Sequence, residues 1–215
     1  MTTTMPQPVR LRFTLDEYYK MIELGILKDY ERAEIVEGEL IKKITVGNRH
    51  AAVVDLLNRI FVKNVSDDIL VRIQNPTRLS DFNEPDLVLA DLTKFNGKRH
   101  PRPTEILLVI EVSDSTLKYD RDVKIPLYAE AEFPEVWIVN LMNEIIEVHT
   151  KPSVGLYQSV KIYKRGETIK TEYLPNLILK VDELLSWQLK DKEVFKIKKC
   201  FRLATTTATG LLRRM

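Results

Sequence analysis

The sequence has little cysteine, no long apolar run and no strong excess of charge of one sign. Its single cysteine, Cys200, cannot form an internal disulfide, which indicates a reducing compartment. No apolar run approaches the roughly 20 residues that a membrane-spanning helix needs. The first residues, Met1 to Pro6, lack the basic start and apolar core of a secretory signal. We therefore expect a cytoplasmic protein with no membrane partner.

The net charge of +2 at pH 7 is unevenly distributed along the chain. Residues 190–215 contain eight basic and two acidic side chains and carry +6, which leaves −4 on residues 1–189. A strong sequence-independent nucleic-acid binder usually has a basic surface. The acidic body therefore argues against tight nonspecific binding to DNA, although a local basic cleft is compatible with it.

Length and composition indicate one folded domain with short appendages. A chain of 215 residues, 44% hydrophobic and 30% charged, is long enough for one well-buried core but short for two. Beyond about Lys190 the pattern deteriorates into a lysine-rich stretch and an aperiodic run, 204–210. We therefore expect a flexible N-terminus (1–10), a folded domain (11–189) and a basic, loosely ordered tail (190–215).

Hydrophobic periodicity and turn residues predict an alternation of helices and strands. Thr14 and Glu17 have the spacing of a capping box, which predicts a helix over Leu15–Leu24 that stops at Gly25. Further along, the chain is predicted to form a hairpin over 33–44 around Gly38, a helix behind Asn48, strands at 69–73, 86–90 and 106–112, a helix over 119–131, strands at 136–139, 145–149 and 157–163, and a closing strand end and helix over 177–187. The order indicates an α/β fold with a mixed central sheet flanked by helices on both faces.

Two carboxylates lie in apolar surroundings and are candidate metal ligands. Asp86 follows Pro85 at the start of one predicted strand, and Glu111 lies near the end of another. Side chains alternate along a strand, so Glu111 shares a face with Val109 and is expensive to keep ionised there without a compensating cation. Mg²⁺ prefers oxygen ligands and typically takes one or two carboxylates together with water and phosphate. Structural ion pairs, with Lys124 or Arg121, are the alternative explanation of both carboxylates.

Lys124 begins the next helical stretch and shares a helix face with Tyr128, four residues later. Directed at a metal site, this lysine would position an attacking water and stabilise charge on phosphate. Pro126 complicates the helix, because a proline in a helix interior costs about 3 kcal/mol or more. We expect the helix either to begin near Val123 or to kink at Pro126.

Two further polar residues are weaker candidates from the pattern alone. His50 shares a helix face with Val53 and Leu57, where a lone histidine is more often a satisfied boundary residue than a ligand. Glu34 lies in the predicted hairpin, where charged side chains are usually exposed.

Together these segments resemble the Uma family of restriction endonucleases, a bacterial branch of the PD-(D/E)XK nuclease superfamily. The resemblance runs from about Leu11 to Trp187. The segments that carry it are Glu-Ile-Val-Glu-Gly-Glu (34–39), His50, Glu-Pro-Asp-Leu-Val (84–88), Val-Ile-Glu-Val-Ser-Asp-Ser-Thr (109–116), Tyr-Asp-Arg-Asp-Val-Lys (119–124), Tyr128-Ala129 and Phe-Pro-Glu-Val-Trp-Ile-Val (133–139).

The resemblance implies a restriction-endonuclease-like fold and Mg²⁺-dependent hydrolysis of DNA phosphodiesters, with Mn²⁺ as a substitute ion. It identifies Asp86 and Glu111 as the metal-binding acids, aided by the Val112 carbonyl. Position 113 is serine where the superfamily motif usually has its lysine, and Lys124 takes that role from the following helix. Glu34 and His50 match family positions near the site.

Two other hypotheses remain open at this stage. The acidic body and the aberrant tail are compatible with an inactive nuclease-fold module that binds nucleic acid or a protein, or with a genomic copy whose reading frame drifted near Lys190. Double-strand cleavage usually needs two active sites, so a homodimer is an expected partner arrangement. The pattern does not distinguish DNA from RNA.

Overall fold

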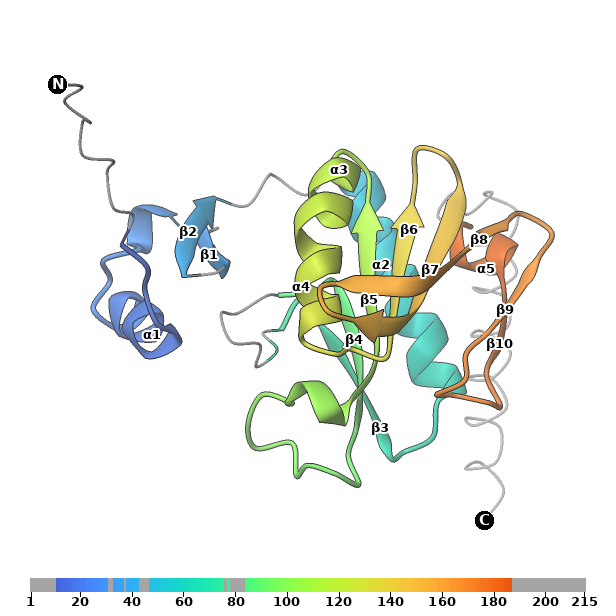
Figure 1. Ribbon diagram of the computed structural model, residues 1–215, viewed down its shortest axis with the longest axis horizontal. Helices are drawn as coiled ribbons and strands as arrows, with labels where there is room; N and C mark the ends of the chain where they lie inside the picture. The colour runs from blue at the N-terminus through green and yellow to red at the C-terminus, as the bar shows by residue number, and fades with distance from the viewer. Residues whose placement is uncertain are drawn as a thin grey trace, which may run out of the picture. The chain divides into compact units, whose positions relative to one another are not determined.

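A six-stranded mixed sheet forms the centre of the fold in the computed structural model (Figure 1). The structure describes residues 11–30, 33–36, 38–42, 47–75, 77 and 84–186, without the side chains of Leu15, Glu34 and Lys42. The predicted N-terminus 1–10 and tail 190–215, as well as Trp187, lie outside the described residues.

The strands of this sheet follow one another in chain order, β3-β4-β5-β6-β7-β8. β5 and β6 are parallel, and the other neighbouring pairs are antiparallel. β5 is buried along nearly its whole length and lies inside the sheet, as its uninterrupted apolar run predicts. The bounds are β3 (Ile69–Ile73), β4 (Leu87–Asp91), β5 (Ile106–Ser113), β6 (Glu135–Asn140), β7 (Ile145–Ser153) and β8 (Leu156–Lys164).

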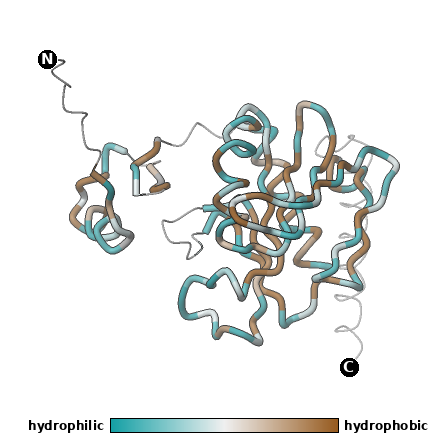
Figure 2. Tube along the Cα trace, in the orientation of Figure 1, coloured by the Kyte–Doolittle hydropathy of each residue, from teal (hydrophilic) through white to brown (hydrophobic). Residues whose placement is uncertain are grey.

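Helices cover both faces of the sheet. On one face, Phe61 of α2 (Asn48–Asn64) packs against Trp137 of β6, with ring centroids 6.0 Å apart. On the other face, Tyr128 of α4 (Ile125–Glu130) joins a buried cluster with Val136, the residue next to Trp137. Neighbouring residues of a strand point to opposite faces, so the α/β architecture with flanking helices is confirmed. Figure 2 shows hydrophobic residues gathered on the strands between these helices.

The N-terminal elements form as the sequence predicts. α1 (Leu15–Glu23) is capped by Thr14, whose side chain and backbone exchange hydrogen bonds with Glu17. The hairpin of β1 (Ala33–Val36) and β2 (Glu39–Lys42) turns at Gly38, where φ is +77°. A β-carbon there would lie 2.7 Å from the Arg12 side chain, so both conformation and space favour glycine.

The helix after β5 forms close to its predicted bounds, 119–131, and is irregular just before Pro126. α3 (Leu117–Tyr119), the π-helical segment η3 (Asp120–Lys124) and α4 follow one another without a break. The Ile125 N–H bonds to the Asp120 carbonyl five residues back, immediately before Pro126. The helix therefore begins at Leu117 rather than near Val123. The wider turn stands where Pro126 lacks the N–H of a regular α-helical bond.

The described chain ends with a short hairpin and a helical turn. β9 (Thr168–Lys170), which the periodicity did not predict, pairs with β10 (Ile178–Lys180), and α5 (Val181–Leu184) follows. Two short 3₁₀ turns, η1 (Lys28–Tyr30) and η2 (Pro103–Glu105), complete the elements. No helix among the described residues has both the length and the apolar character to cross a membrane.

Candidate active site

Glu111 of β5 lies at the centre of the candidate site. Its side chain is almost fully buried, with 2% exposed, on the sheet face that α4 covers. Lys124 donates from Nζ to one carboxylate oxygen at 2.9 Å, and the Tyr128 hydroxyl donates to the other. Lys124 and Tyr128 therefore lie on one helix face, as their spacing predicts. The helix brings a lysine to the position that the sequence of β5 does not supply.

Asp86 precedes β4 and lies beside the end of β5. Its Oδ2 accepts a hydrogen bond from the Val112 N–H at 2.9 Å and lies 2.9 Å from Nε2 of His50, in the first turn of α2. Its Oδ1 lies 3.5 Å from Nε2 of Gln74. The N–H and C=O of one strand residue point to the same side, so the Val112 carbonyl also faces β4. Three separate elements thus converge on Asp86.

Asp120 forms a second ion pair with Lys124, one turn earlier on the same helix, and the sequence pattern did not single out this residue. Its Oδ1 lies 3.6 Å from Lys124 Nζ, and its Oδ2 accepts hydrogen bonds from Ser113 Oγ at 2.6 Å and Thr116 Oγ1 at 2.7 Å. Asp120 is 2% exposed. The signal in the sequence was the four-residue spacing of Thr116, Asp120 and Lys124, which places all three on one side of a helix.

The electrostatics of the cluster favour an added positive charge. Burial raises the pKa of Glu111 to about 8; Lys124 opposes the shift, while Asp86 and Asp120 add to it. Burial also raises the pKa of Asp86, but the hydrogen bond and charge of His50, the charge of Lys124 and the Val112 N–H outweigh it, so this pKa lies below its ordinary value. Three carboxyl groups share one ammonium group, and one of them resists ionisation.

A divalent cation fits this donor set. Asp86 and Glu111 supply hard oxygen ligands, and a cation would offset the unfavourable charge of Glu111. Within the described part of the chain, no three Asp, Glu, His or Cys side chains form a metal-binding group. A cation here would therefore depend on two carboxylates, a backbone carbonyl such as that of Val112, water and a substrate phosphate, as Mg²⁺ commonly does.

The other predicted residues fare differently. His50 is half-buried and has a partner, since its Nε2 contacts Asp86, whereas its Nδ1 is buried without a hydrogen bond among the described residues. Glu34 lies on β1, and its side chain lies outside the described residues. Arg121, the alternative partner of the site carboxylates, pairs instead with Glu147 of β7. A structural ion pair with Lys124 was the alternative to metal binding, and such a pair is present between Lys124 and Glu111.

Comparison with known proteins identifies the family and the fold of the chain. Residues 15–182 match the family model Uma2, described as "Putative restriction endonuclease". Among solved structures, a "putative nuclease belonging to DUF820" from Anabaena variabilis ATCC 29413 has the same fold, with a TM-score of 0.63 and 18% identity over 82% of this chain and 99% of the other. None of the curated proteins matches the chain in sequence. The matched range includes every residue of the candidate site.

Proposed function

Since the chain belongs to the Uma2 family of restriction endonucleases, we propose that it is a metal-dependent endonuclease that hydrolyses DNA phosphodiester bonds. Asp86 and Glu111 would hold one Mg²⁺, with the Val112 carbonyl as a further ligand, and Mn²⁺ would substitute. The bound cation would supply a metal-activated water and offset charge on the scissile phosphate. The protein would act on its substrate in the cytoplasm.

The chain's own residues have distinct parts in this proposal. Lys124, held between Glu111 and Asp120, would orient the attacking water and stabilise charge that develops on the phosphate. Tyr128 fixes the Glu111 carboxylate by its hydroxyl hydrogen bond. His50 orients the Asp86 carboxylate through its Nε2 contact with Oδ2. Glu34 remains a further candidate from the resemblance alone.

One observation carries the proposal: Lys124 Nζ lies 2.9 Å from Glu111 Oε2 although the two residues are on different elements. A buried lysine, two acids and their hydrogen-bond donors in one cluster are typical of a hydrolytic metal site and exceed what packing requires. Breaking such a pair is costly, and apolar residues of the same size would be at least as stable.

Plasmid nicking tests the proposal. In Mg²⁺ or Mn²⁺, the purified protein should convert supercoiled plasmid to open circles, and chelation of the metal should stop the reaction. Asp86→Asn and Glu111→Gln should each reduce the rate by roughly 100-fold or more. Glu135→Gln is the matched control, because Glu135 is a buried carboxylate of β6 bonded to Trp137 and Thr171 away from the site. Equal nicking by all four proteins would reject the assignment.

A second candidate function, an inactive binding module, is favoured by the hydrogen bonds that Glu111 already accepts. Both Glu111 oxygens already accept from Lys124 and Tyr128, as expected of an inactive module that retains the nuclease fold and binds nucleic acid or a protein. Calorimetric titration with Mn²⁺ separates the two candidates. Binding that Asp86→Asn abolishes favours the enzyme, whereas no binding at millimolar Mn²⁺ favours the module.

We also propose that the enzyme works as a homodimer, since cleavage of both strands of a duplex is most directly achieved by two symmetric sites. Light scattering coupled to size exclusion measures the mass in solution. A strictly monomeric protein that linearises plasmid in one binding event would contradict the dimer without affecting the assignment of the site.

A further inference from the structure

We propose that the loop between β4 and β5, residues 92–105, is a contact surface for the phosphate backbone of the duplex whose scissile bond lies at Asp86 and Glu111. The inference rests on the proposed function and names a substrate-binding surface for it. Neither the charge of the body nor the carboxylate cluster identifies such a surface.

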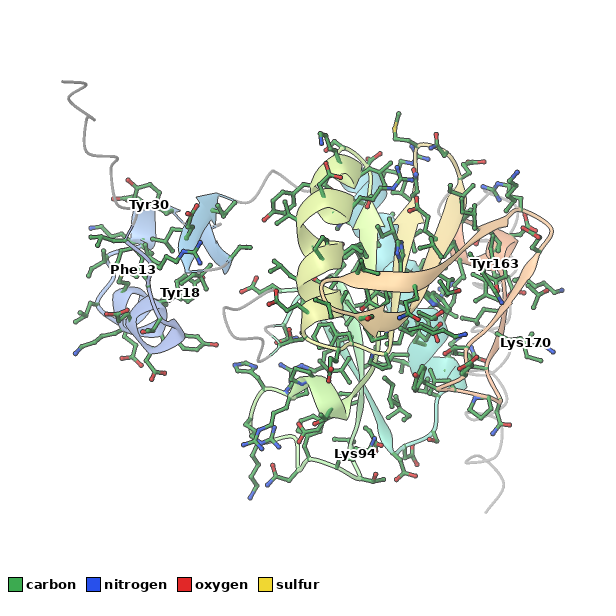
Figure 3. All side chains as sticks on the ribbon, viewed as in Figure 1. Phe13, Tyr18, Tyr30, Lys94, Tyr163 and Lys170 are labelled. Carbon is green, nitrogen blue, oxygen red and sulfur yellow. The ribbon has the colours of Figure 1, made fainter. Side chains whose placement is uncertain are left out.

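Charge distribution singles out this loop. Residues 1–189 carry −4, whereas residues 92–105 contain four Lys or Arg side chains and one Glu and carry +3, so the rest of residues 1–189 carries −7. Lys94, Lys98 and Arg102 of the loop are exposed. Figure 2 shows the loop as mostly hydrophilic, and Figure 3 labels Lys94 on it. Residues 92–105, which connect β4 to β5, are therefore a local basic region within an acidic body.

The loop is internally braced, so its cations are presented from a fixed backbone. Arg99 donates two hydrogen bonds to Glu105, at 2.8 and 2.6 Å, and lies over the Phe95 ring. Glu105 also accepts from the Arg102 N–H at 2.8 Å, and Phe95 is buried. The Arg99 hydrogen bonds lower the pKa of Glu105 to about 2, although burial opposes them. Arg99 is paired with Glu105, and Lys94 lies 3.3 Å from Asp91 Oδ2, so Lys98 and Arg102 are the loop cations best placed to contact a ligand.

The loop connects to the sheet face that carries the site. Arg72 pairs with Val88 across β3 and β4, and directly opposed side chains share a face. Val88 belongs to the same buried cluster as Tyr128 and Val109, so Arg72 lies on the face of Glu111. Its Nη2 is 3.2 Å from Nδ1 of His100 in the loop. Arg72 and His100 thus connect the β3 side of this sheet face to the loop.

The separation matches the dimensions of a duplex. The loop begins at Leu92, six residues after Asp86 and directly after β4, so it begins roughly 20 Å from Asp86 at about 3.3 Å per residue. Phosphates of one DNA strand follow every 3.4 Å or so along the helix axis, and the span corresponds to about six base pairs. A backbone held at the loop would therefore contact the protein at a second point while its scissile phosphate occupied the carboxylate site.

The test compares two double variants in DNA binding. Lys98→Ala with Arg102→Ala removes two loop cations without altering Phe95, Arg99 or Glu105. Lys161→Ala with Lys170→Ala removes equal charge from β8 and β9, where both lysines are exposed. Fluorescence anisotropy with a labelled 20-base-pair duplex, in Ca²⁺ and from about 50 to 200 mM salt, gives affinity and its salt dependence.

We expect the loop variant to bind about tenfold or more weakly, with a log–log salt slope shallower by about 2, and the control to bind like the wild type. Equal binding by both variants, or no binding by the wild type at 50 mM salt, would overturn the inference. Plasmid nicking measured in parallel keeps the two proposals separate. Wild-type nicking with loop-independent binding rejects only the loop, whereas loop-dependent binding without nicking rejects only the nuclease activity.

Discussion

Lys124 is the residue on which the chemistry of the site depends most. It is 9% exposed and lies within 4 Å of two carboxylates, Glu111 at 2.9 Å and Asp120 at 3.6 Å. A buried ammonium group so enclosed is held in one orientation, and it separates acids that would otherwise repel one another. Asp120 is itself fixed by Ser113 and Thr116, so the position of Lys124 is determined from both sides.

Replacing Lys124 with methionine separates activity from metal binding. Methionine keeps most of the volume of the lysine stem, so the packing around Glu111 is retained while the ammonium group is removed. We expect nicking to fall by about 100-fold or more, while Mn²⁺ binding is retained because both metal-binding acids remain. Lys118→Met is the control on the same helix, since Lys118 is 89% exposed. Nicking by Lys124→Met at the wild-type rate would remove the lysine from the mechanism.

At the scale of elements, local signals predicted the fold better than the site. The Thr14 capping box and the Gly38 turn depend on neighbours within four residues, and the apolar run of β5 needs only burial on both faces. The π-helical turn of η3 has no such signal, because its extra residue becomes evident only in the i to i−5 bond before Pro126.

The site shows the same division. The positions of Asp86, directly before β4, and of Glu111, on the neighbouring β5, follow from their places in the sequence pattern, but the contacts of His50 and Tyr128 with them do not. His50 reaches Asp86 from α2, and the Tyr128 hydroxyl reaches Glu111 from α4. These contacts depend on how helices are placed on the sheet, which sequence spacing alone does not fix.

A second tie between η3 and the sheet makes stability depend on pH. Arg121 of η3 donates Nε to Glu147 of β7 at 3.0 Å and makes a second bond through Nη2. Burial raises the pKa of Glu147, but nearby His149 and the Arg121 hydrogen bonds outweigh this effect and lower the pKa to about 2. In the unfolded chain this pKa is near 4.3. The ion pair therefore stabilises the folded state fully above about pH 4.5, and this contribution is lost as the pH falls toward 2.

Glu147→Gln should lower the free energy of unfolding by about 1–2 kcal/mol at pH 7, a discounted value because the Arg121 side chain is 43% exposed. The difference from wild type should shrink steadily in urea titrations at pH 4 and pH 3. Glu144→Gln is the control, since Glu144 pairs with Arg165 on the surface and both side chains are more than 40% exposed. A difference for Glu147→Gln that stays constant from pH 7 to pH 3 would exclude the ion pair as its cause.

At the scale of the whole molecule, the folded body and the basic C-terminal segment are distinguishable by charge and by family match. The family model ends at residue 182, and the last described helix, α5, buries Val181 and Leu184. Residues 190–215 carry +6 and have no hydrophobic periodicity. The family match and the described elements therefore both end before this segment, whose charge is opposite to that of residues 1–189.

Removing residues 190–215 should leave Tm within about 2 °C of the full chain, because about 1 kcal/mol corresponds to a 2–4 °C shift in a chain of this size. Plasmid nicking should persist, while DNA binding should weaken and lose part of its salt dependence with the six net positive charges.

Removing residues 177–215 is the matched control: it deletes buried Leu179, Val181 and Leu184 and should lower Tm by far more. A fall of more than about 5 °C for the shorter deletion would mean that the segment packs on the body. Unchanged DNA binding would instead assign the electrostatic contact to the body, where the 92–105 loop is the basic surface that could supply it.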